Sequence, residues 1–299
     1  KEEKMKLKAA TKLFSNTSIL VVGAAIGFLT SGMAARVLGP EDFGFAAYIL
    51  NISGLMSILC SFGYQFRFAQ SQRNFRINAN ELHKASSLSF ITLILLMPFV
   101  IFTFNDASIN QWMLVFVFLH SIFFILVEQL YYYYNSTGEQ FKAVFNRSFI
   151  AKILPFCFIL CVIFFGLELQ AQTFIGVLII GLAAVIFLNL KKFSWCFPNF
   201  EYLKTIRTFY FVQLLYFIPS FGLRLLYVEI ASLTALAYLT LGIMFSQVIN
   251  LFSSSICNQL APRFRIALQN NNLNELKELL QKSAFYPSLM MVPFLIIFA

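Results

Sequence analysis

The chain has little charge for its length. Only 12% of its 299 residues are Asp, Glu, Lys or Arg, whereas 59% are hydrophobic and 38 are phenylalanine. A soluble core could not hide so much apolar surface, but a lipid bilayer does not require that it be hidden. The composition therefore predicts a polytopic membrane protein and excludes a soluble domain.

Histidine and cysteine are also scarce, with two histidines and five scattered cysteines. The closest pair, Cys157 and Cys161, shares a helix face but has no His or acid nearby. Small buried hydrophobic residues are therefore the favoured interpretation over a metal pair. No disulfide framework, metal or cofactor is expected. No GxxxxGK[ST] motif occurs either, so direct use of ATP is not expected.

Nine apolar segments come close to the roughly 20 residues that a helix needs to cross a bilayer. They lie at 14–38, 45–66, 86–104, 112–134, 148–167, 173–190, 209–229, 232–257 and 284–299. We therefore expect an all-α helical bundle with about nine spans. The ninth segment stops at the end of the chain, so we expect the chain to be part of a longer protein.

The first two segments meet at a short turn. Arg36 closes the first segment, Gly39-Pro40 follows, and Glu41 and Asp42 precede the next apolar run. Gly-Pro does not continue a helix, and acids favour the first turn of a new one. The stretch predicts a tight hairpin between two spanning helices, with Arg36 just inside the bilayer.

The positive charges are distributed unevenly. Twenty of the 22 Lys and Arg residues lie in the N-terminal arm and in alternate breaks between segments, at 67–84, 142–152, 191–207 and 263–282. The other breaks carry mainly acids. By the positive-inside rule, the N-terminus and the basic breaks face the cytoplasm. This topology accounts for the net charge of +9, and we expect no nucleic-acid partner.

Polar residues recur at helical spacing in the first, second, seventh and eighth segments. The first also carries a GxxxG, Gly23 to Gly27, whose favoured interpretation is close helix packing. Polar side chains in a bilayer face other helices or a water-filled cavity. Bonding between helices could explain any one stripe, but four such stripes favour a shared cavity. The stripes of the second, seventh and eighth segments are, in that order, Asn51, Gly54, Ser61 and Gln65; Gln213, Tyr216, Ser220 and Arg224; and Thr240, Gln247, Asn250, Ser254 and Asn258.

Arg224 lies well within the seventh apolar segment. An intramembrane arginine costs roughly 2.5–3.5 kcal/mol on insertion scales, so such residues commonly have a function. Binding of an anion is one interpretation. Snorkelling to the outer surface, or pairing with Glu229, is the other. For Arg36, nearer the predicted interface, the interfacial interpretation is stronger.

Glu128 and His120 in the fourth segment raise the possibility of a proton relay. They are 80° apart around a helix at 100° per residue, so they do not share a face cleanly. Glu128 also lies just before the run Tyr131 to Tyr134, whose residues are typical of a membrane interface. An interfacial, partly solvated carboxylate is therefore the favoured interpretation.

The stretch from Arg36 to Gly44, RVLGPEDFG, resembles the Arg-x-Leu-Gly-Pro-Glu-x-Phe/Tyr-Gly signature of polysaccharide-biosynthesis flippases. These are the O-antigen translocases of the multidrug/oligosaccharidyl-lipid/polysaccharide exporter superfamily. Residues 237–242, AYLTLG, are similar to the family's Gly-x-Tyr segment, and 260–264, LAPRF, to its proline-containing exit. The amphipathic stretch 273–282 fits its cytoplasmic connector. The family often has an Asp where this chain has Leu223.

The resemblance implies two six-helix lobes with a central cavity lined by spans one, two, seven and eight. Residues 1–208 would form the N-terminal arm and first lobe, and 209–299 the start of the second. Such flippases carry an undecaprenyl-pyrophosphate-linked oligosaccharide from the cytoplasmic to the periplasmic leaflet of the bacterial inner membrane, by alternating access. Arg36 and Arg224 would bind the pyrophosphate. The candidates for the sugar contacts are Asn51, Gln213, Gln247 and Asn250.

The resemblance also implies partners: the lipid-linked oligosaccharide, membrane lipid, and the polymerase and ligase of lipopolysaccharide or another surface polysaccharide. An ion-coupled multidrug or toxic-compound extruder is the alternative, but it would need acids in the cavity. A membrane polymerase, ligase or acyltransferase would need a base or nucleophile in a substantial outer loop. Because the outer breaks are short, we expect no enzymatic or catalytic site. A purely structural protein would not explain arginines inside spans.

Overall fold

The computed structural model describes residues 2–71, 79–103, 111–198, 200–244 and 270–281, with 264, 267, 268, 283 and 285. These residues are almost entirely helical, and no strand occurs among them. In chain order the elements are α1 (Glu2–Ser61), α2 (Tyr64–Ser71), α3 (Ala79–Thr103), α4 (Gln111–Ser136), α5 (Gln140–Val144), the π-helix η2 (Phe145–Ile150), α6 (Ala151–Phe165), α7 (Ala171–Leu188), the 3-10 helix η3 (Leu190–Lys192) and α8 (Phe200–Ile230). A helix at Leu233–Met244 follows.

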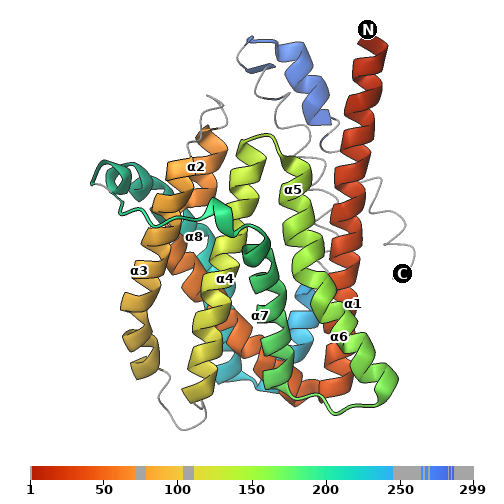
Figure 1. Cartoon of the computed structure of the whole chain (residues 1–299), viewed down its shortest axis with the longest axis vertical. Coiled ribbons are helices and arrows are strands. Elements are labelled where there is room, and N and C mark those ends of the chain that lie inside the picture. The colour runs from red at the N-terminus through yellow and green to blue at the C-terminus, as the bar shows by residue number, and fades with distance from the viewer. Residues whose placement is uncertain are drawn as a thin grey trace.

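α1 is bent back on itself at Gly39, where the backbone is not helical (φ 80°, ψ 167°), and Pro40 opens the returning half. In Figure 1, α1 descends from the N-terminus, turns at the lower end of the bundle and rises towards α2. A positive φ is accessible to glycine without steric cost, and the missing N–H of proline is tolerated at the start of a helix. The predicted hairpin at Gly39-Pro40 is confirmed.

Within the described residues, five helices are long and apolar enough to cross a membrane. They are Ile19–Ser61, Ala79–Phe102, Met113–Ser136, Gln140–Phe165 and Ala171–Leu188. The protein is therefore an all-α membrane protein. The bent first helix covers the first two predicted spans, and α8 covers the predicted seventh. Half of the eighth and nearly all of the ninth lie outside the described residues.

The two-lobe arrangement stays a prediction, as do the division at 208/209 and the full number of spans. That division falls inside α8, which runs from Phe200 to Ile230.

The second half of α1 lies at the centre of the bundle. Its residues Ala46, Ile49 and Cys60 are fully buried. On the side facing α4, the Ser121 hydroxyl donates to the Ser53 carbonyl oxygen at 3.2 Å. Hydrogen bonds between helices are a common contact inside membranes, where lipid gives helices no hydrophobic reason to associate. α7 in turn packs between α4 and α6 (Figure 1).

A similar polar contact joins α3 to α4. The Gln129 side chain is fully buried, accepts a hydrogen bond from the Ser86 hydroxyl at 2.8 Å and donates one to the Ser89 hydroxyl at 2.9 Å. Both ends of the amide are therefore satisfied, as burial requires.

The GxxxG of α1 packs closely, as predicted. A Cβ placed on Gly23 would overlap the backbone carbonyl of Ser148, so only glycine lets the two helices approach this far.

The expectation that Cys157 and Cys161 are buried is wrong, because both thiols are exposed on the outer face of α6. In a membrane that face meets lipid, which accepts a thiol as readily as a protein core does.

We expect Gly23→Leu to destabilise the protein, because the added side chain has to displace the backbone at Ser148. Overpacking of this kind costs about 1–3 kcal/mol or more. Gly32→Leu is the matched control, since a Cβ at Gly32 in the same helix would meet no atom within 4 Å. Thermal unfolding of the two variants in detergent tests this. Equal melting temperatures for both would contradict the close contact.

Candidate functional site

α8 packs antiparallel against the second half of α1, and we call this contact the α1–α8 seam (α1 residues 40–61 with α8). Two glycines show how close the helices are. A Cβ on Gly54 would overlap the ring of Phe221. A Cβ on Gly63, just beyond α1, would lie 2.5 Å from the carbonyl carbon of Phe209. Residue numbers therefore increase along α1 in the direction in which they decrease along α8, as in any antiparallel pair. This arrangement brings together polar residues that the sequence placed in separate segments.

Arg224 and Asn51 meet across the seam. The Arg224 Nη1 donates to the Asn51 Oδ1 at 3.3 Å, and the guanidinium lies 5.2 Å from the centre of the Phe221 ring. Asn51 is itself held, since its Nδ2 donates to the Ala47 carbonyl at 2.8 Å. Among the described side chains, the partner of Arg224 is therefore a neutral amide and an aromatic face. Its charge is oriented but not neutralised there.

Gln213 lies on the same face of α8 as Arg224, three helical turns earlier. Its Nε2 donates to the Ser61 hydroxyl and, at 3.4 Å, to the Ile58 carbonyl oxygen. The side chain is buried, yet its Oε1 has no hydrogen-bond partner among the described residues. A buried acceptor of this kind usually has a partner, such as an ordered water.

An open hollow of about 560 Å³ lies beside Arg224, between α8 and the helix at Leu233–Met244. Apart from Arg224, its walls are aliphatic or aromatic: Leu223, Leu226, Tyr227, Ile230, Leu239 and Ile243. None of these lining residues is acidic. The site thus combines one positive charge with an apolar surface.

The structure does not bring Arg36 to this site. Arg36 is exposed and lies four residues before Pro40, about 6 Å of helix from the turn. Asn51, which holds Arg224, lies eleven residues past Pro40, or about 16 Å. The two arginines are therefore at different depths. Gln247 and Asn250 lie outside the described residues.

A second charged site lies within the first part of the chain. Arg147 Nε is 2.5 Å from the Glu128 Oε1, and its guanidinium lies 4.5 Å from the centre of the Tyr131 ring. Glu128 is only 8% exposed. The expectation of a solvated interfacial carboxylate is wrong, because the approaching arginine compensates the charge that burial would otherwise penalise.

The position of Arg147 corrects another expectation. Lys142, Arg147 and Lys152 do not lie in a break between spans, because the candidate span Gln140–Phe165 contains all three. Arg147 falls within η2, the π-helical turn, and such turns often occur at functional positions. Lys152 lies against α1, where a Cβ on Gly27 would be 3.0 Å from the Lys152 Nζ. His120 does not pair with Glu128; its Nδ1 has no partner among the described residues.

Sequence reasoning missed the Glu128–Arg147 pair, although a signal for it exists. The turn between α4 and α5 contains Thr137 and Gly138. Glu128 lies nine residues before Thr137, and Arg147 lies nine residues after Gly138. In an antiparallel helical hairpin, residues equally far from the turn lie at the same level. A search for opposite charges placed symmetrically about each turn would have found the pair.

Comparison of the chain with protein-family models, curated proteins and solved structures finds no match. The resemblance to polysaccharide flippases therefore rests on the motifs quoted above.

We expect Glu128→Gln to lower the free energy of unfolding by about 1–2 kcal/mol. Breaking a fully buried pair costs more, but the Arg147 side chain is 41% exposed, so water partly compensates its charge. Glu139→Gln is the matched control, because Glu139 pairs with Lys142 at the exposed start of the same helical hairpin. Water screens an exposed pair, so we expect no measurable loss for Glu139→Gln.

Unfolding of both variants in detergent, with the double change Glu128→Gln and Arg147→Gln, completes the test. The double variant should lose less than the sum of the single changes. Additive losses would show that the two side chains do not interact.

Proposed function

We propose that this protein is a membrane flippase for an anionic, lipid-linked oligosaccharide. The observation that carries the proposal is Arg224, which Asn51 orients beside an apolar hollow and which no described carboxylate neutralises. A cation inside a membrane is costly unless something compensates it. A substrate with a charged diphosphate and a hydrocarbon tail supplies both the missing anion and a surface that suits the apolar walls.

The contrast with Arg147 supports this interpretation. Arg147 has a carboxylate partner in Glu128, which is what a purely structural role requires. Arg224 has an amide partner instead, and an amide holds a guanidinium in position without cancelling its charge. A binding site for a phosphate needs this arrangement, because a permanent carboxylate would compete with the substrate.

The amide residues of the seam suit the sugar part of the substrate. The carbonyl oxygen of Gln213, which has no partner among the described residues, lies on the Arg224 face of α8, eleven residues away and thus about 16 Å along the axis. A chain of sugar units could extend over that distance from a diphosphate at Arg224. Gln247 and Asn250 are proposed to contribute from the eighth span. Arg36, which is exposed near the turn, would meet the headgroup on entry or release.

The proposed mechanism is alternating access at the seam between the two lobes, in the bacterial inner membrane with the N-terminus in the cytoplasm. The hydrocarbon tail would remain in lipid while the diphosphate and sugars cross inside the protein. The acid-poor walls of the hollow argue against the alternative, an ion-coupled extruder of cationic drugs.

Arg224→Gln tests the site directly. Hydrogen bonds to a charged group are worth about 1.5–3 kcal/mol, so we expect a roughly 10- to 100-fold loss in substrate affinity. Transport should fall in proportion at limiting substrate, and Arg224→Lys should restore part of it. Arg207→Gln is the control, because it removes the same charge from an exposed position of the same helix.

The measurement is surface polysaccharide in cells that lack their own flippase and express the complete gene product, at equal membrane levels of each variant. Wild-type transport that survives Arg224→Gln would eliminate the site. Failure of the wild type with several lipid-linked precursors, together with increased drug resistance, would instead favour an extruder.

A further inference from the structure

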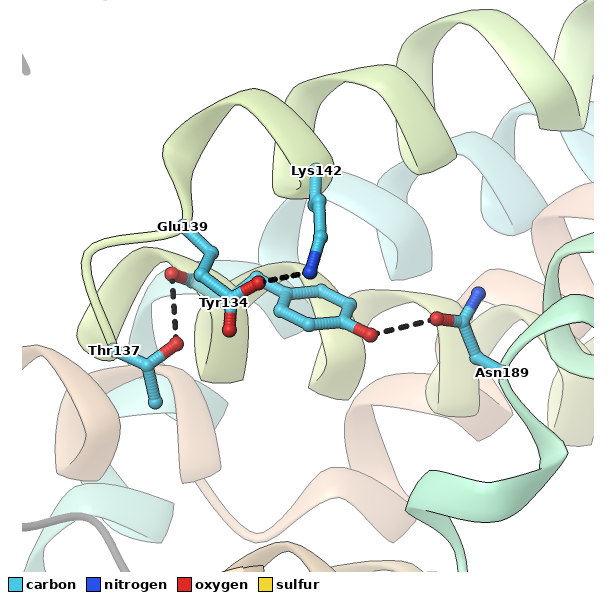
Figure 2. Close-up of polar contacts among 5 residues, drawn as sticks. All are labelled: Tyr134, Thr137, Glu139, Lys142 and Asn189. Atoms are coloured by element: carbon cyan, nitrogen blue, oxygen red, sulfur yellow. Dashed lines mark hydrogen bonds and ion pairs between the residues drawn. The ribbon is translucent and has the colours of Figure 1, made fainter.

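A second hollow, of about 610 Å³, opens where the turn between α4 and α5 meets the end of α7. It is separate from the α1–α8 seam, since it is lined by different helices. Its polar lining residues come from four elements and the junction after α7: Tyr134, Lys142, Asn146, Asn189, Lys191 and Lys192. Figure 2 shows how several of these side chains converge.

The inner wall of this hollow is held in place by hydrogen bonds. The Tyr134 hydroxyl donates to the Asn189 Oδ1 at 2.7 Å, and the Asn189 Nδ2 donates to the Val185 carbonyl at 2.8 Å (Figure 2 draws the first). Tyr134 is only 3% exposed. The wall is therefore pre-formed, which lowers the entropic cost of binding a ligand.

The charge of the hollow is positive. Lys142 forms an ion pair with Glu139 and lies 5.8 Å from the centre of the Tyr134 ring. Lys191 and Lys192 follow α7 in η3 and are both exposed. No lining residue is acidic. Lysines after a helix also complement its dipole. That effect accounts for Lys191 and Lys192 at the end of α7, whereas Lys142 is held at the hollow by its ion pair with Glu139.

The outer rim is apolar. Phe187, Leu188 and Leu190 line the hollow, and each is at least half exposed. Phe187 and Leu188 end α7, one of the helices long and apolar enough to cross a membrane, so they face acyl chains, and Leu190 follows in η3. A soluble anion would use the lysines alone. A ligand that uses both surfaces has an anionic head and a hydrocarbon tail.

The neighbouring segment 193–198 indicates the depth of the lysines. It is tied to α3, because the Ser194 N–H donates to the His83 Nδ1 and the Cys196 N–H to the Ser87 hydroxyl, each at 3.0 Å. Trp195 in this segment is exposed and packs edge-on against Phe90, with ring centres 5.8 Å apart. Tryptophan is enriched at the level of lipid headgroups, and Lys192 is three residues from Trp195.

We propose that this hollow binds the phosphate headgroup of an anionic phospholipid. Lys191 and Lys192 contact the phosphate, Lys142 and the Tyr134–Asn189 pair form the back wall, and the exposed residues of α7 contact the acyl chains. Basic pockets between spanning helices bind headgroups in this way. The proposal is independent of the flippase function, since it depends only on the membrane location and on this hollow.

The test uses the complete gene product in nanodiscs that contain phosphatidylglycerol or phosphatidylcholine. Native mass spectrometry counts the lipids that remain bound after mild activation. The double variant Lys191→Gln, Lys192→Gln removes two charges from the hollow. The control is Lys204→Gln with Arg207→Gln, which removes two charges from exposed positions of α8. Binding of inorganic phosphate to the protein in detergent without lipid tests whether the hollow is a site for a soluble anion.

We expect retained phosphatidylglycerol on the wild type and on the control, and at least a tenfold lower affinity on the double variant, since each lysine near a charged membrane contributes severalfold. Phosphatidylcholine should not be retained. Equal retention by the double variant, or an equal loss by the control, would overturn the proposal. Tight binding of inorganic phosphate with no preference for phosphatidylglycerol would overturn the lipid as ligand and leave a soluble-anion site.

Discussion

The left-handed backbone at Gly39 makes the rest of the structure possible, because it returns the second half of α1 into the middle of the bundle. That half then packs with α4 through serine hydroxyls and with α8 through the bare backbone of Gly54. In a membrane, helices gain little from hiding apolar surface from each other, so close packing and hydrogen bonds hold them together. Residues with small or polar side chains are accordingly concentrated on this central helix.

Two half-buried arginines in this bundle have partners of different chemistry. Arg147 is compensated by Glu128, and the pair fixes how α4 meets the helix that starts at Gln140. Arg224 is oriented by Asn51 without an opposing charge among the described residues. The first arrangement needs no ligand, whereas a cation held only by an amide leaves a place for water or an anion. The difference between a structural charge and a candidate binding charge is thus the chemistry of the partner.

The two hollows have similar linings, although they lie in different parts of the bundle. Each combines lysine or arginine with exposed aliphatic and aromatic side chains, and each lacks an acid among its lining residues. Such surfaces suit amphiphilic anions, whose charge and hydrocarbon are accommodated together. At the hollow beside Arg224 the proposed ligand is a substrate that crosses the membrane. Near η3 the proposed ligand is a lipid that stays in one leaflet and holds α5 and α7 together.

The sequence by itself determined the helical class, the membrane location and the turn at Gly39-Pro40. These depend on local hydropathy and on the backbone preferences of single residues, which are readable without knowing what lies nearby. The polar stripes also pointed to Asn51, Gln213 and Arg224. Only the tertiary structure decided that Asn51 meets Arg224, that Glu128 is paired instead of solvated, and that three lysines line one hollow. A hydropathy pattern cannot show this, because the partner of a charge is chosen by which helices lie side by side.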